Sequence, residues 1–417
     1  MSSNAFSAAH VDGNYWYGQI EALFRPEIRG TAFVVGGDPK TRKGIVLTKS
    51  PEAKAWGVKT GSSIMEASRI CPNLTVLPAN YPLYQYFTER MREIVLQHTD
   101  TIRPFGSDEM WCQLYGDRKA VMKTVYEIRQ AIWQQLCITV SIGVGDNLPY
   151  AKIGSDLAPN NGVCELWTED RDWFVYPLPV SDLLYVGPAT TKKLRSYGIE
   201  TIGDLAKSTP ERICEIVKSK TGASLWVMAN GLDRTPVAHL DRVDDIKSIG
   251  NSNTMPYDLT TYEDVKIAFY MLAESVAARM RDDGFEARTI SISIRDDELF
   301  SYSRQMKLTR PTNLAAELVP AAMELFRRSN KRDNTFAVRS LGIRGSDLVA
   351  EGSVYQLSLF DDEERREKII KLEDAVDRMR GRFGKDIIQR AVLLQPRLKS
   401  VNANNDSDDA PIFYKYR

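Results

Sequence analysis

Short apolar strands alternate with amphipathic helices along most of this 417-residue chain, and acidic residues stand at the ends of two strands. Residues 5 to 24 run as an apolar strand into Asp12, turn at Gly13 and continue as a helix. That helix carries four apolar side chains at the spacing of a packed face, namely Trp16, Ile20, Leu23 and Phe24. The pattern predicts an α+β fold in which sheets are layered with helices.

The order of the elements predicts several domains, as the length of the chain also does. Residues 31 to 78 form a small unit in which two strands flank a polar turn, and residues 79 to 178 return to the first sheet. Residues 181 to 236 are helical. A polar connector then leads to a second α+β unit with cleanly alternating strands and with helices at about 262 to 281 and 313 to 328.

The C-terminal part, residues 353 to 417, differs in composition from the rest. It opens on a short apolar motif, continues as a charged helix at about 362 to 382, and ends in twenty residues rich in Asn, Asp and Ser. We expect that tail to be disordered, because it has too few apolar side chains to offset the entropy of folding.

The overall charge gives no sign of a polyanionic partner, since 55 basic residues balance 55 acidic ones. This is weak evidence against nucleic acid, because binding depends on where the charges lie. No stretch approaches eighteen consecutive apolar residues, and the first residues lack the order of a signal peptide. We therefore expect a cytoplasmic protein that makes no use of a membrane.

Asp12 and Gly13 form the first candidate site. An aspartate at the end of an apolar strand, followed at once by a glycine turn, places a carboxylate beside a free backbone carbonyl. Both are hard oxygen ligands that suit Mg²⁺. The alternative is that Asp12 only caps the helix that follows.

Asp108 and Glu109 form the second candidate site, at the start of another strand. Adjacent carboxylates repel each other unless a cation neutralises them. A regular strand would point them to opposite faces, so a shared metal site requires a turn, which Gly106 permits. The alternative is an exposed acidic hairpin. Five cysteines without paired spacing and three histidines cannot make a convincing zinc site, so we expect oxygen ligands for any metal.

Together these segments resemble the Y-family DNA polymerases of the DNA polymerase IV kind, and further motifs follow in the family's order over roughly residues 8 to 360. They are VVGGDP, GIVLTKSPEAKAWGVKTG, SIGVGDNLPYAKIGSDLAPNNG, VGPATTKKLRSYGIETIGDL, SIGNSNT and QLSLF. The resemblance implies a right-hand polymerase that adds deoxynucleotides to primed DNA, in translesion synthesis. It also implies the following domains: palm 1–30 and 79–178, fingers 31–78, helix-hairpin-helix thumb 181–236, and α/β little finger 247–345.

The resemblance implies that Asp12, Asp108 and Glu109 bind two Mg²⁺ ions, with Asp12 bridging them and the Gly13 carbonyl joining the ion that carries the nucleotide. Phosphoryl transfer to a primer hydroxyl needs one metal to activate the attacking oxygen and one to stabilise the leaving group. The family's nucleotide contacts fall on five residues here: Tyr15, Trp16, Tyr17, Thr48 and Lys54.

Two of these nucleotide contacts have plain alternatives. The resemblance makes Tyr17 a steric gate whose ring excludes a ribose 2′-hydroxyl, but Tyr17 could equally be a core tyrosine of an amphipathic helix. Lys54 suits a phosphate as a point charge. It could also be an exposed lysine without a role.

The DNA contacts implied by the resemblance begin at Gly187, where a hairpin opens a helix whose N–H groups suit a phosphate. Basic residues of the 247 to 344 unit could follow the DNA backbone, namely Arg304, Lys307, Arg310, Arg339 and Arg344. Scattered solvated charge is the alternative.

A sliding-clamp motif is implied by the last matching segment. Its polar and apolar residues are Gln356, Leu357, Leu359 and Phe360. An exposed apolar cluster usually marks a partner site, although a strand edge folded against the little finger is the alternative. The expected partners are primer-template DNA, deoxynucleoside triphosphates and a bacterial sliding clamp, and we expect a monomer.

The chain departs from the family at positions that touch the nucleotide. Pro51 stands where many members have a tyrosine, Lys54 where they have an arginine, and Pro159 where they have a lysine, and Ile45 and Leu47 are bulkier than usual. Pro51 and Pro159 leave open an inactive homologue that binds DNA and clamp. A second rival is a nucleotidyl cyclase built on a related palm, since that class also sets paired carboxylates around two metals.

Overall fold

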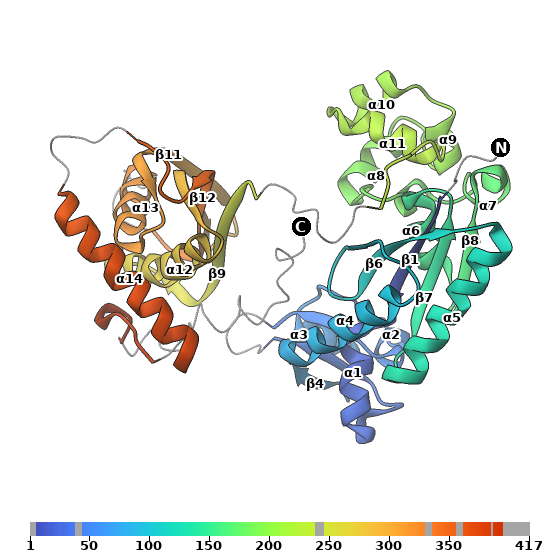
Figure 1. The fold of residues 1–417 in the computed structure, drawn as a ribbon, viewed down its shortest axis with the longest axis horizontal. Coiled ribbons are helices and arrows are strands. Elements are labelled where there is room, and N and C mark those ends of the chain that lie inside the picture. Colours follow the sequence, from blue (N-terminus) through green and yellow to red (C-terminus); the bar gives the residue numbers. More distant parts are fainter. Residues whose placement is uncertain are drawn as a thin grey trace.

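The computed structural model describes residues 6–37, 44–237, 246–329, 336–355, 362–384 and 387–394. The helices and strands form four groups (Figure 1). The group with four strands has a hydrophobic core of its own, whereas two further cores include residues from more than one group. The predicted α+β, multidomain architecture is confirmed. Within these described ranges, no helix has both the length and the apolar composition that crossing a bilayer requires.

The first group, the five-stranded unit, has the strand order β5-β6-β1-β7-β8. Its strands are β1 (Phe6–Gly13), β5 (Ile102–Pro104), β6 (Glu109–Tyr115), β7 (Val140–Gly145) and β8 (Val163–Leu166). Its helices are α1 (Trp16–Phe24), α4 (Tyr81–Leu96), α5 (Arg118–Leu136) and α6 (Leu148–Leu157). Strand β1 is central and antiparallel to both neighbours, and its residues from Ser7 to Val11 are buried.

The two faces of β1 meet different helices, because side chains alternate along a strand. Ala9 and Val11 belong to the core that includes Met91 of α4 and Ile128 of α5. Ala8 instead packs with residues of α6, as does Trp111 of β6. His10 and Asp12 share the face of Ala8, so the carboxylate of Asp12 lies on the side covered by α6.

Helix α6 approaches the sheet unusually closely because strand β7 has Gly143 beneath it. A Cβ atom on Gly143 would lie 1.9 Å from the carbonyl oxygen of Ala151 and 2.1 Å from the backbone nitrogen of Ser155. Gly143 is the cross-strand neighbour of His10. The Asn147 side chain fixes the start of the helix by accepting a hydrogen bond from the backbone N–H of Tyr150. The close approach therefore positions the middle of α6 above β1.

The three-stranded unit has the order β3-β2-β4, with β2 antiparallel to β3 and parallel to β4. Its elements are β2 (Phe33–Gly36), β3 (Val46–Lys49), β4 (Thr75–Pro78), α2 (Pro51–Ala55) and α3 (Ile64–Ile70). Ser50 is the N-cap of helix α2, and its side chain accepts a hydrogen bond from the backbone N–H of Ala53. Pro51 follows at the first helical position, where the missing N–H costs nothing.

The helical unit has no sheet and packs four short helices: α8 (Pro188–Arg195), α9 (Ile202–Ala206), α10 (Pro210–Val217) and α11 (Thr221–Ala229). Thr201 and Asp204 form a reciprocal capping box at the start of α9. Further short helices are η1 (Pro26–Ile28), η3 (Thr168–Asp170), α7 (Arg171–Phe174), η4 (Val180–Asp182) and η5 (Ala391–Leu394).

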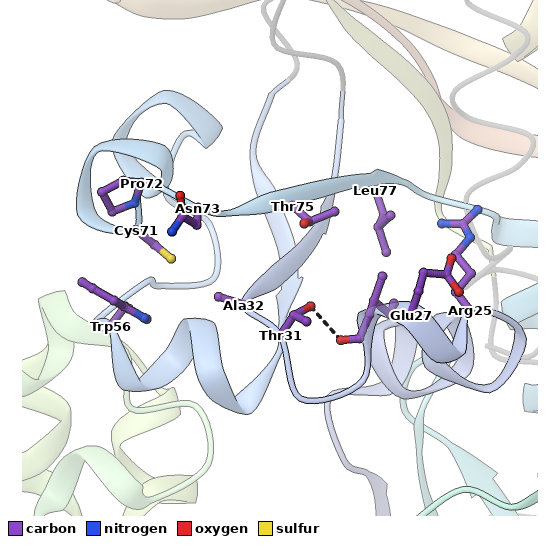
Figure 2. Close-up of a pocket in the computed structure, with 11 residues that line it drawn as sticks. Arg25, Glu27, Thr31, Ala32, Trp56, Cys71, Pro72, Asn73, Thr75 and Leu77 are labelled. Carbon is purple, nitrogen blue, oxygen red and sulfur yellow. Dashed lines mark hydrogen bonds between the residues drawn. The ribbon is translucent and has the colours of Figure 1, made fainter.

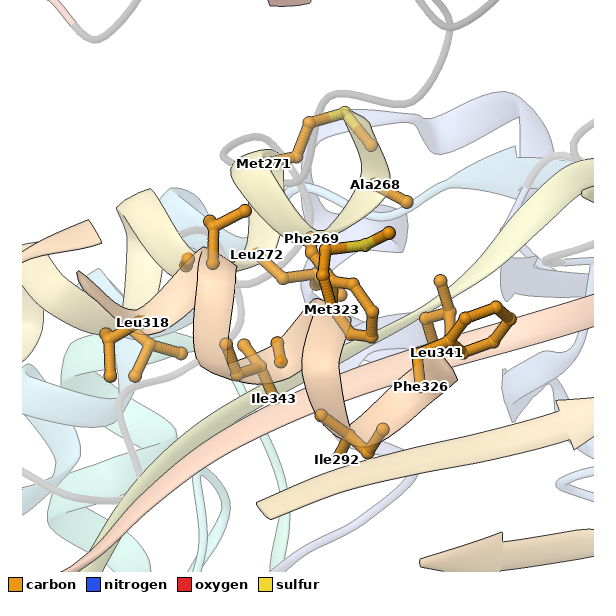
Figure 3. Packing of buried hydrophobic residues seen from close by; sticks show 14 of the residues in the cluster. Ala268, Phe269, Met271, Leu272, Ile292, Leu318, Met323, Phe326, Leu341 and Ile343 are labelled. Carbon is orange, nitrogen blue, oxygen red and sulfur yellow. The ribbon is translucent and has the colours of Figure 1, made fainter. Parts of the chain in front are cut away.

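The four-stranded unit is an antiparallel sheet in the order β11-β10-β12-β9, with helices on one face. Its elements are β9 (Ser248–Leu259), α12 (Tyr262–Asp282), β10 (Phe285–Asp296), β11 (Ser301–Thr312), α13 (Ala315–Ser329) and β12 (Val338–Ala350). Figure 3 shows Phe269 and Leu272 of α12 and Phe326 of α13 packed over Ile292 and Ile343 of the sheet. Both helices lie close to the ranges predicted for them.

Helix α14 (Glu363–Phe383) is the predicted charged helix, and it docks on the four-stranded unit through charges. Its Glu373 is 4% exposed and lies 2.7 Å from the guanidinium of Arg281 on α12. Glu373 also accepts a hydrogen bond from the backbone N–H of Ala315, at the start of α13. A carboxylate is stabilised at a helix N-terminus, so one side chain joins three helices.

Two predictions about the first helix are corrected. Helix α1 begins at Trp16, and its N-cap residue is Tyr15, which makes no side-chain capping bond. Asp12 is therefore not the cap, and that alternative is wrong. Phe24 is 61% exposed, so the packed face of the helix ends before it.

Candidate active site

Asp12 and Glu109 are brought side by side by the pairing of β1 with β6. They are directly opposite each other in the register, and opposite residues of an antiparallel pair project from the same face. His10, two residues before Asp12, shares that face. One ligand atom from each of His10, Asp12 and Glu109 lies within 4.8 Å of the others, an arrangement that could hold a metal ion.

Asp108 lies beside this group, at the residue before β6 begins. The backbone N–H of Gly13 donates to the Asp108 carbonyl at 2.9 Å, which ties the turn after β1 to the turn before β6. Burial raises the pKa of the Asp108 carboxyl to about 7, and the charges of Asp12 and Glu109 add to the rise. Asp108 is thus close enough to feel both carboxylates, although it is outside the tightest group.

The ammonium of Lys152 on α6 stands among the carboxylates. Its Nζ lies 2.9 Å from Asp12 Oδ2, 2.9 Å from Glu109 Oε2 and 2.9 Å from Asp156 Oδ1. Although burial opposes the charge, these carboxylates raise the pKa of Lys152. The sequence interpretation missed this lysine, because its place above Asp12 depends on the close packing of α6.

The pKa values of Asp12 and Glu109 move in opposite directions. Burial raises the pKa of Asp12 in spite of the nearby Lys152 charge. Burial also acts to raise the pKa of Glu109, but the hydrogen bond with His10 and the charge of Lys152 outweigh it and hold the pKa below its usual value. Two carboxylates of one small site therefore differ in how readily they ionise.

His10, which the sequence interpretation also missed, belongs to this group. The ring is fully buried, with Nδ1 2.8 Å from Ser155 Oγ and Nε2 3.3 Å from Glu109 Oε2. Burial lowers its pKa. The two-residue period of a strand places His10 beside Asp12 and could have identified it.

Tyr17 projects from α1 toward the turn that carries Asp108. Its ring stacks on Tyr84 with centroids 4.3 Å apart, and its hydroxyl lies 3.2 Å from Ser107 Oγ. Burial raises the pKa of Tyr17 to about 12. Tyr17 is half-buried and packs on an aromatic neighbour near Asp108, so its role as a steric gate stays a prediction.

The neighbours of Tyr17 are placed differently. The Trp16 side chain is 2% exposed in the core of the five-stranded unit, where Gly13 leaves room for its ring. A nucleotide contact by this side chain is therefore excluded, which corrects that prediction. Tyr15 has a left-handed backbone, with φ 33°, at the start of α1. Its pKa is raised by burial and by the charge of Glu52 on α2.

The predicted phosphate-binding residues lie on the three-stranded unit. Thr48 is on β3 and half-buried, and Lys54 is exposed on α2. A further lysine, Lys49, lies near Lys54. Burial lowers the pKa of Lys49, and the charge of Lys54 lowers it further. Lys49 donates to Thr60 Oγ1 at 2.9 Å. The two ammonium groups make this corner of the unit a positive patch that the sequence interpretation had only half identified.

Two cavities accompany these residues. One, of about 600 Å³, is lined by Lys152 and Asp156 of α6 and by Ser181 to Gly187 at the entrance of the helical unit. The other, of about 740 Å³, lies between Trp56, Cys71 and Thr75 of the three-stranded unit and Arg25 near the end of α1 (Figure 2). Asp12, Asp108 and Glu109 do not line the second cavity, so it is separate from the metal-binding group.

Gly187, the predicted phosphate contact of the helical unit, is the N-cap of α8. A Cβ at this position would meet nothing within 4 Å. The backbone at the start of α8 is therefore accessible, and basic residues lie in the last turn of the same helix.

The face of the four-stranded sheet opposite its helices is lined by small polar residues. Ser291 and Ser293 of β10 are opposite Arg344 and Gly342 of β12, which in turn are opposite Gly250 and Ser252 of β9. A Cβ on Gly342 would touch both Ser293 and Ser252, which confirms that they share one face. We call this surface the open face.

The predicted DNA-binding residues divide between the open face and other places. Arg344 is on the open face, and so is Lys307, which is opposite Thr289. Arg304 is opposite the buried Ile292, so it projects on the helical side.

Arg310 forms ion pairs with Glu317 and Glu363. Arg304 is therefore not on the open face and Arg310 is held by two carboxylates, and a DNA contact by either stays a prediction. Arg339 lies at an irregularity of the register. Gln356 to Phe360 lie outside the described residues.

The sequence matches known family models over most of its length. Residues 11–156 match the impB/mucB/samB family, residues 246–359 match its C-terminal domain, and residues 181–233 match the thumb domain of DNA polymerase iota. A DNA polymerase IV of Acetivibrio thermocellus is 42% identical over 395 residues, which are 93% of this chain and 97% of the relative. The DNA polymerase IV 1 of Bacillus subtilis is 32% identical over 406 residues, or 95% and 96% of the two chains.

Solved structures agree on the fold. A Y-family DNA polymerase chimera superimposes with a TM-score of 0.72 at 22% identity, covering 83% of this chain and all of the chimera. The DinB structure from Sulfolobus solfataricus gives a TM-score of 0.53 at 22% identity over 83% of this chain and all of that one. The chain therefore belongs to the impB/mucB/samB family, the Y family of DNA polymerases, and it is a DNA-directed DNA polymerase of translesion synthesis.

Proposed function

We propose that Asp12, Asp108 and Glu109 bind the two Mg²⁺ ions of the polymerase reaction, with the Gly13 carbonyl as a further ligand. One observation carries this proposal: three carboxylates meet at one end of two paired strands, where burial, together with the charges of Asp12 and Glu109, raises the pKa of Asp108 to about 7. Such repulsion is relieved when a cation binds. Hard carboxylate oxygens are the donors that Mg²⁺ prefers, so the residues fit the ion.

In this proposal the ions, when bound, activate the primer hydroxyl and stabilise the charge on the leaving pyrophosphate. The chain itself fixes the ligands. The β1 and β6 register holds Asp12 against Glu109, and the hydrogen bond from Gly13 to Asp108 holds the third carboxylate beside them. His10 orients Glu109 from the buried side, because its Nε2 lies against Glu109 Oε2. Fixed ligands reduce the reorganisation that the reaction requires.

The nucleotide is proposed to lie between α1 and the three-stranded unit. The Tyr17 ring, held by Tyr84 and next to Asp108, would exclude the 2′-hydroxyl of a ribonucleotide. Tyr15 and Thr48 are further proposed contacts. Lys54, with Lys49 beside it, would bind the triphosphate as a pair of point charges. This pair compensates for the absence of the arginine that the family usually has at the position of Lys54.

Primer-template DNA is the proposed partner of the open face and of the Gly187 hairpin. Serine hydroxyls, glycines and the cations Arg344 and Lys307 suit contacts with the phosphate backbone, which carry no sequence information. The backbone N–H groups at the start of α8 add a phosphate site of the kind found at helix N-termini.

The units then correspond to the domains of a right-hand polymerase. We propose palm for residues 1–30 and 79–178, fingers for 31–78, thumb for 181–236 and little finger for 247–345. Gln356 to Phe360 are proposed to bind a bacterial sliding clamp, because three of the residues from Leu357 to Phe360 are large and apolar. We further propose that the protein is a cytoplasmic monomer.

Primer extension by the purified protein tests the catalytic proposal. Asp108→Ala should abolish extension while DNA binding persists, because the carboxylate acts on metal ions rather than on phosphates. A variant that keeps a tenth of the wild-type rate would overturn the metal assignment. Absence of extension by the wild type would favour the inactive-homologue alternative, and cyclic product from a nucleoside triphosphate would favour the cyclase.

A further inference from the structure

Lys152 is placed where a metal ion would be expected. Its ammonium lies 2.9 Å from Asp12 Oδ2 and 2.9 Å from Glu109 Oε2, and both carboxylates belong to the candidate metal group. The lysine side chain is only 12% exposed, so the charge is held in the site rather than extended into solvent. A positive charge in this place neutralises carboxylates that would otherwise repel one another.

A divalent ion and this ammonium cannot share those oxygens, since like charges a few ångströms apart repel strongly in a partly buried site. The ammonium has a further partner outside the candidate metal group. Asp156, one turn further along α6, also lies 2.9 Å from Lys152 Nζ, and its side chain is 52% exposed. Both residues line the cavity of about 600 Å³, so the lysine has space to withdraw from the carboxylates.

We propose that Lys152 is the counter-cation of the metal-free site, and that it transfers from Asp12 and Glu109 to Asp156 when a divalent cation binds. The inference rests on the proposed metal site. It adds that Lys152 competes with the divalent cation and thereby lowers the affinity of the site for that cation. Lys152 is a positioning residue in this role. It keeps the carboxylates together without metal, and it makes metal binding conditional on its own displacement.

Mn²⁺ binding to the full chain, measured by calorimetry without DNA or nucleotide, tests the proposal. Lys152→Met should bind Mn²⁺ at least about tenfold more tightly, because the competing charge is gone. Lys152→Arg should remain near the wild type. In EDTA, Lys152→Met should unfold at a lower temperature than the wild type, and Mn²⁺ should restore more of its stability. The matched control is Lys123→Met, which removes an exposed lysine that pairs with Glu127 one turn away on α5.

Asp156 is tested by a double-mutant cycle. Asp156→Asn should weaken Mn²⁺ binding by roughly two- to fivefold, the effect of an exposed ion pair, because the displaced ammonium loses its second partner. In the Lys152→Met background the same substitution should have almost no effect. An equal loss in both backgrounds would mean that Asp156 acts on the ion directly, and it would overturn the transfer.

Failure of this inference differs from failure of the metal site. If Asp12→Asn binds Mn²⁺ as well as the wild type, the proposed metal site is wrong. If Asp12→Asn loses binding while Lys152→Met binds with wild-type affinity or more weakly, the site stands and the role of Lys152 is overturned.

Discussion

At the scale of single residues, the carboxylate site is built from contacts of two kinds. Some could be predicted from the sequence, and others could not. Asp12 and Glu109 could be predicted, since each stands at the end of a patterned strand and the family places them together. His10 could also have been found from the strand period. Lys152 could not, because it is 140 residues from Asp12 and only the packing of α6 brings them together. Helix packing, which the sequence pattern does not specify, limited the prediction.

The raised pKa of Asp108 predicts a pH dependence in the metal-free protein. Since the folded pKa of about 7 exceeds the reference value of 3.8, folding favours the protonated acid. Its stabilising effect is complete below about pH 4 and is lost as the pH rises through 7. Asp108→Asn should therefore match the wild type in EDTA near pH 4 and melt at a higher temperature at pH 8. A melting difference that does not change with pH would contradict the assignment.

Removal of the Tyr17 ring should admit ribonucleotides. Tyr17→Ala opens the space beside Asp108, whereas Asp12 and Glu109 stay in the sheet register. We expect the ratio of deoxynucleotide to ribonucleotide kcat/KM to fall by about tenfold or more, which corresponds to about 1.4 kcal/mol. Tyr17→Phe, which keeps the ring and loses only the hydroxyl near Ser107, is the control. If alanine leaves the ratio unchanged, Tyr17 is only a packing residue.

At the scale of secondary structure, the contact between α6 and β7 decides where the middle of the helix lies. Because Gly143 has no room for a side chain, Gly143→Ala should force the helix away from the sheet. We expect a loss of about 1 to 3 kcal/mol in the free energy of unfolding, as overpacked sites usually show, together with slower primer extension. Denaturant titration measures the first effect. Gly187→Ala is the matched control, since a Cβ there meets nothing and stability should hardly change.

The docking of α14 makes a second prediction at this scale. Glu373 is buried and pairs with Arg281 and Arg390, at 2.7 and 2.8 Å. Removal of one partner of a buried ion pair leaves the others uncompensated, so Glu373→Ala should destabilise the four-stranded unit by about 3 to 5 kcal/mol. Glu364→Ala, in an exposed pair with Lys368, should cost about 0.5 kcal/mol or less. Similar costs for both would show that α14 is only loosely attached.

The same helix shows why element types were easier to predict than their contacts. The ranges of α12, α13 and α14 follow from periodicity and charge. The roles of Arg304 and Arg310 did not, because a basic residue on a strand can face either side, and only the register with β10 and the position of Glu363 decide which.

At the scale of the whole molecule, the open face predicts which cations contribute to DNA affinity. Arg344→Ala and Lys307→Ala should each reduce the slope of log affinity against log salt concentration by about one. Arg304→Ala, on the helical side, should leave that slope unchanged. Fluorescence anisotropy with primed DNA at several salt concentrations provides the slopes. A loss at Arg304 equal to that at Arg344 would place the DNA elsewhere.

The hydrophobic core of the four-stranded unit includes no residue of the other three units, and this has a calorimetric consequence. A chain with several cores need not melt in one cooperative step, so a single melting temperature does not describe it. A scan should resolve more than one heat-absorption peak. Mn²⁺ should move the peak of the five-stranded unit, whereas Glu373→Ala should move that of the four-stranded unit. A partly melted population could therefore retain an ordered metal site while the surface proposed to hold the DNA is already lost.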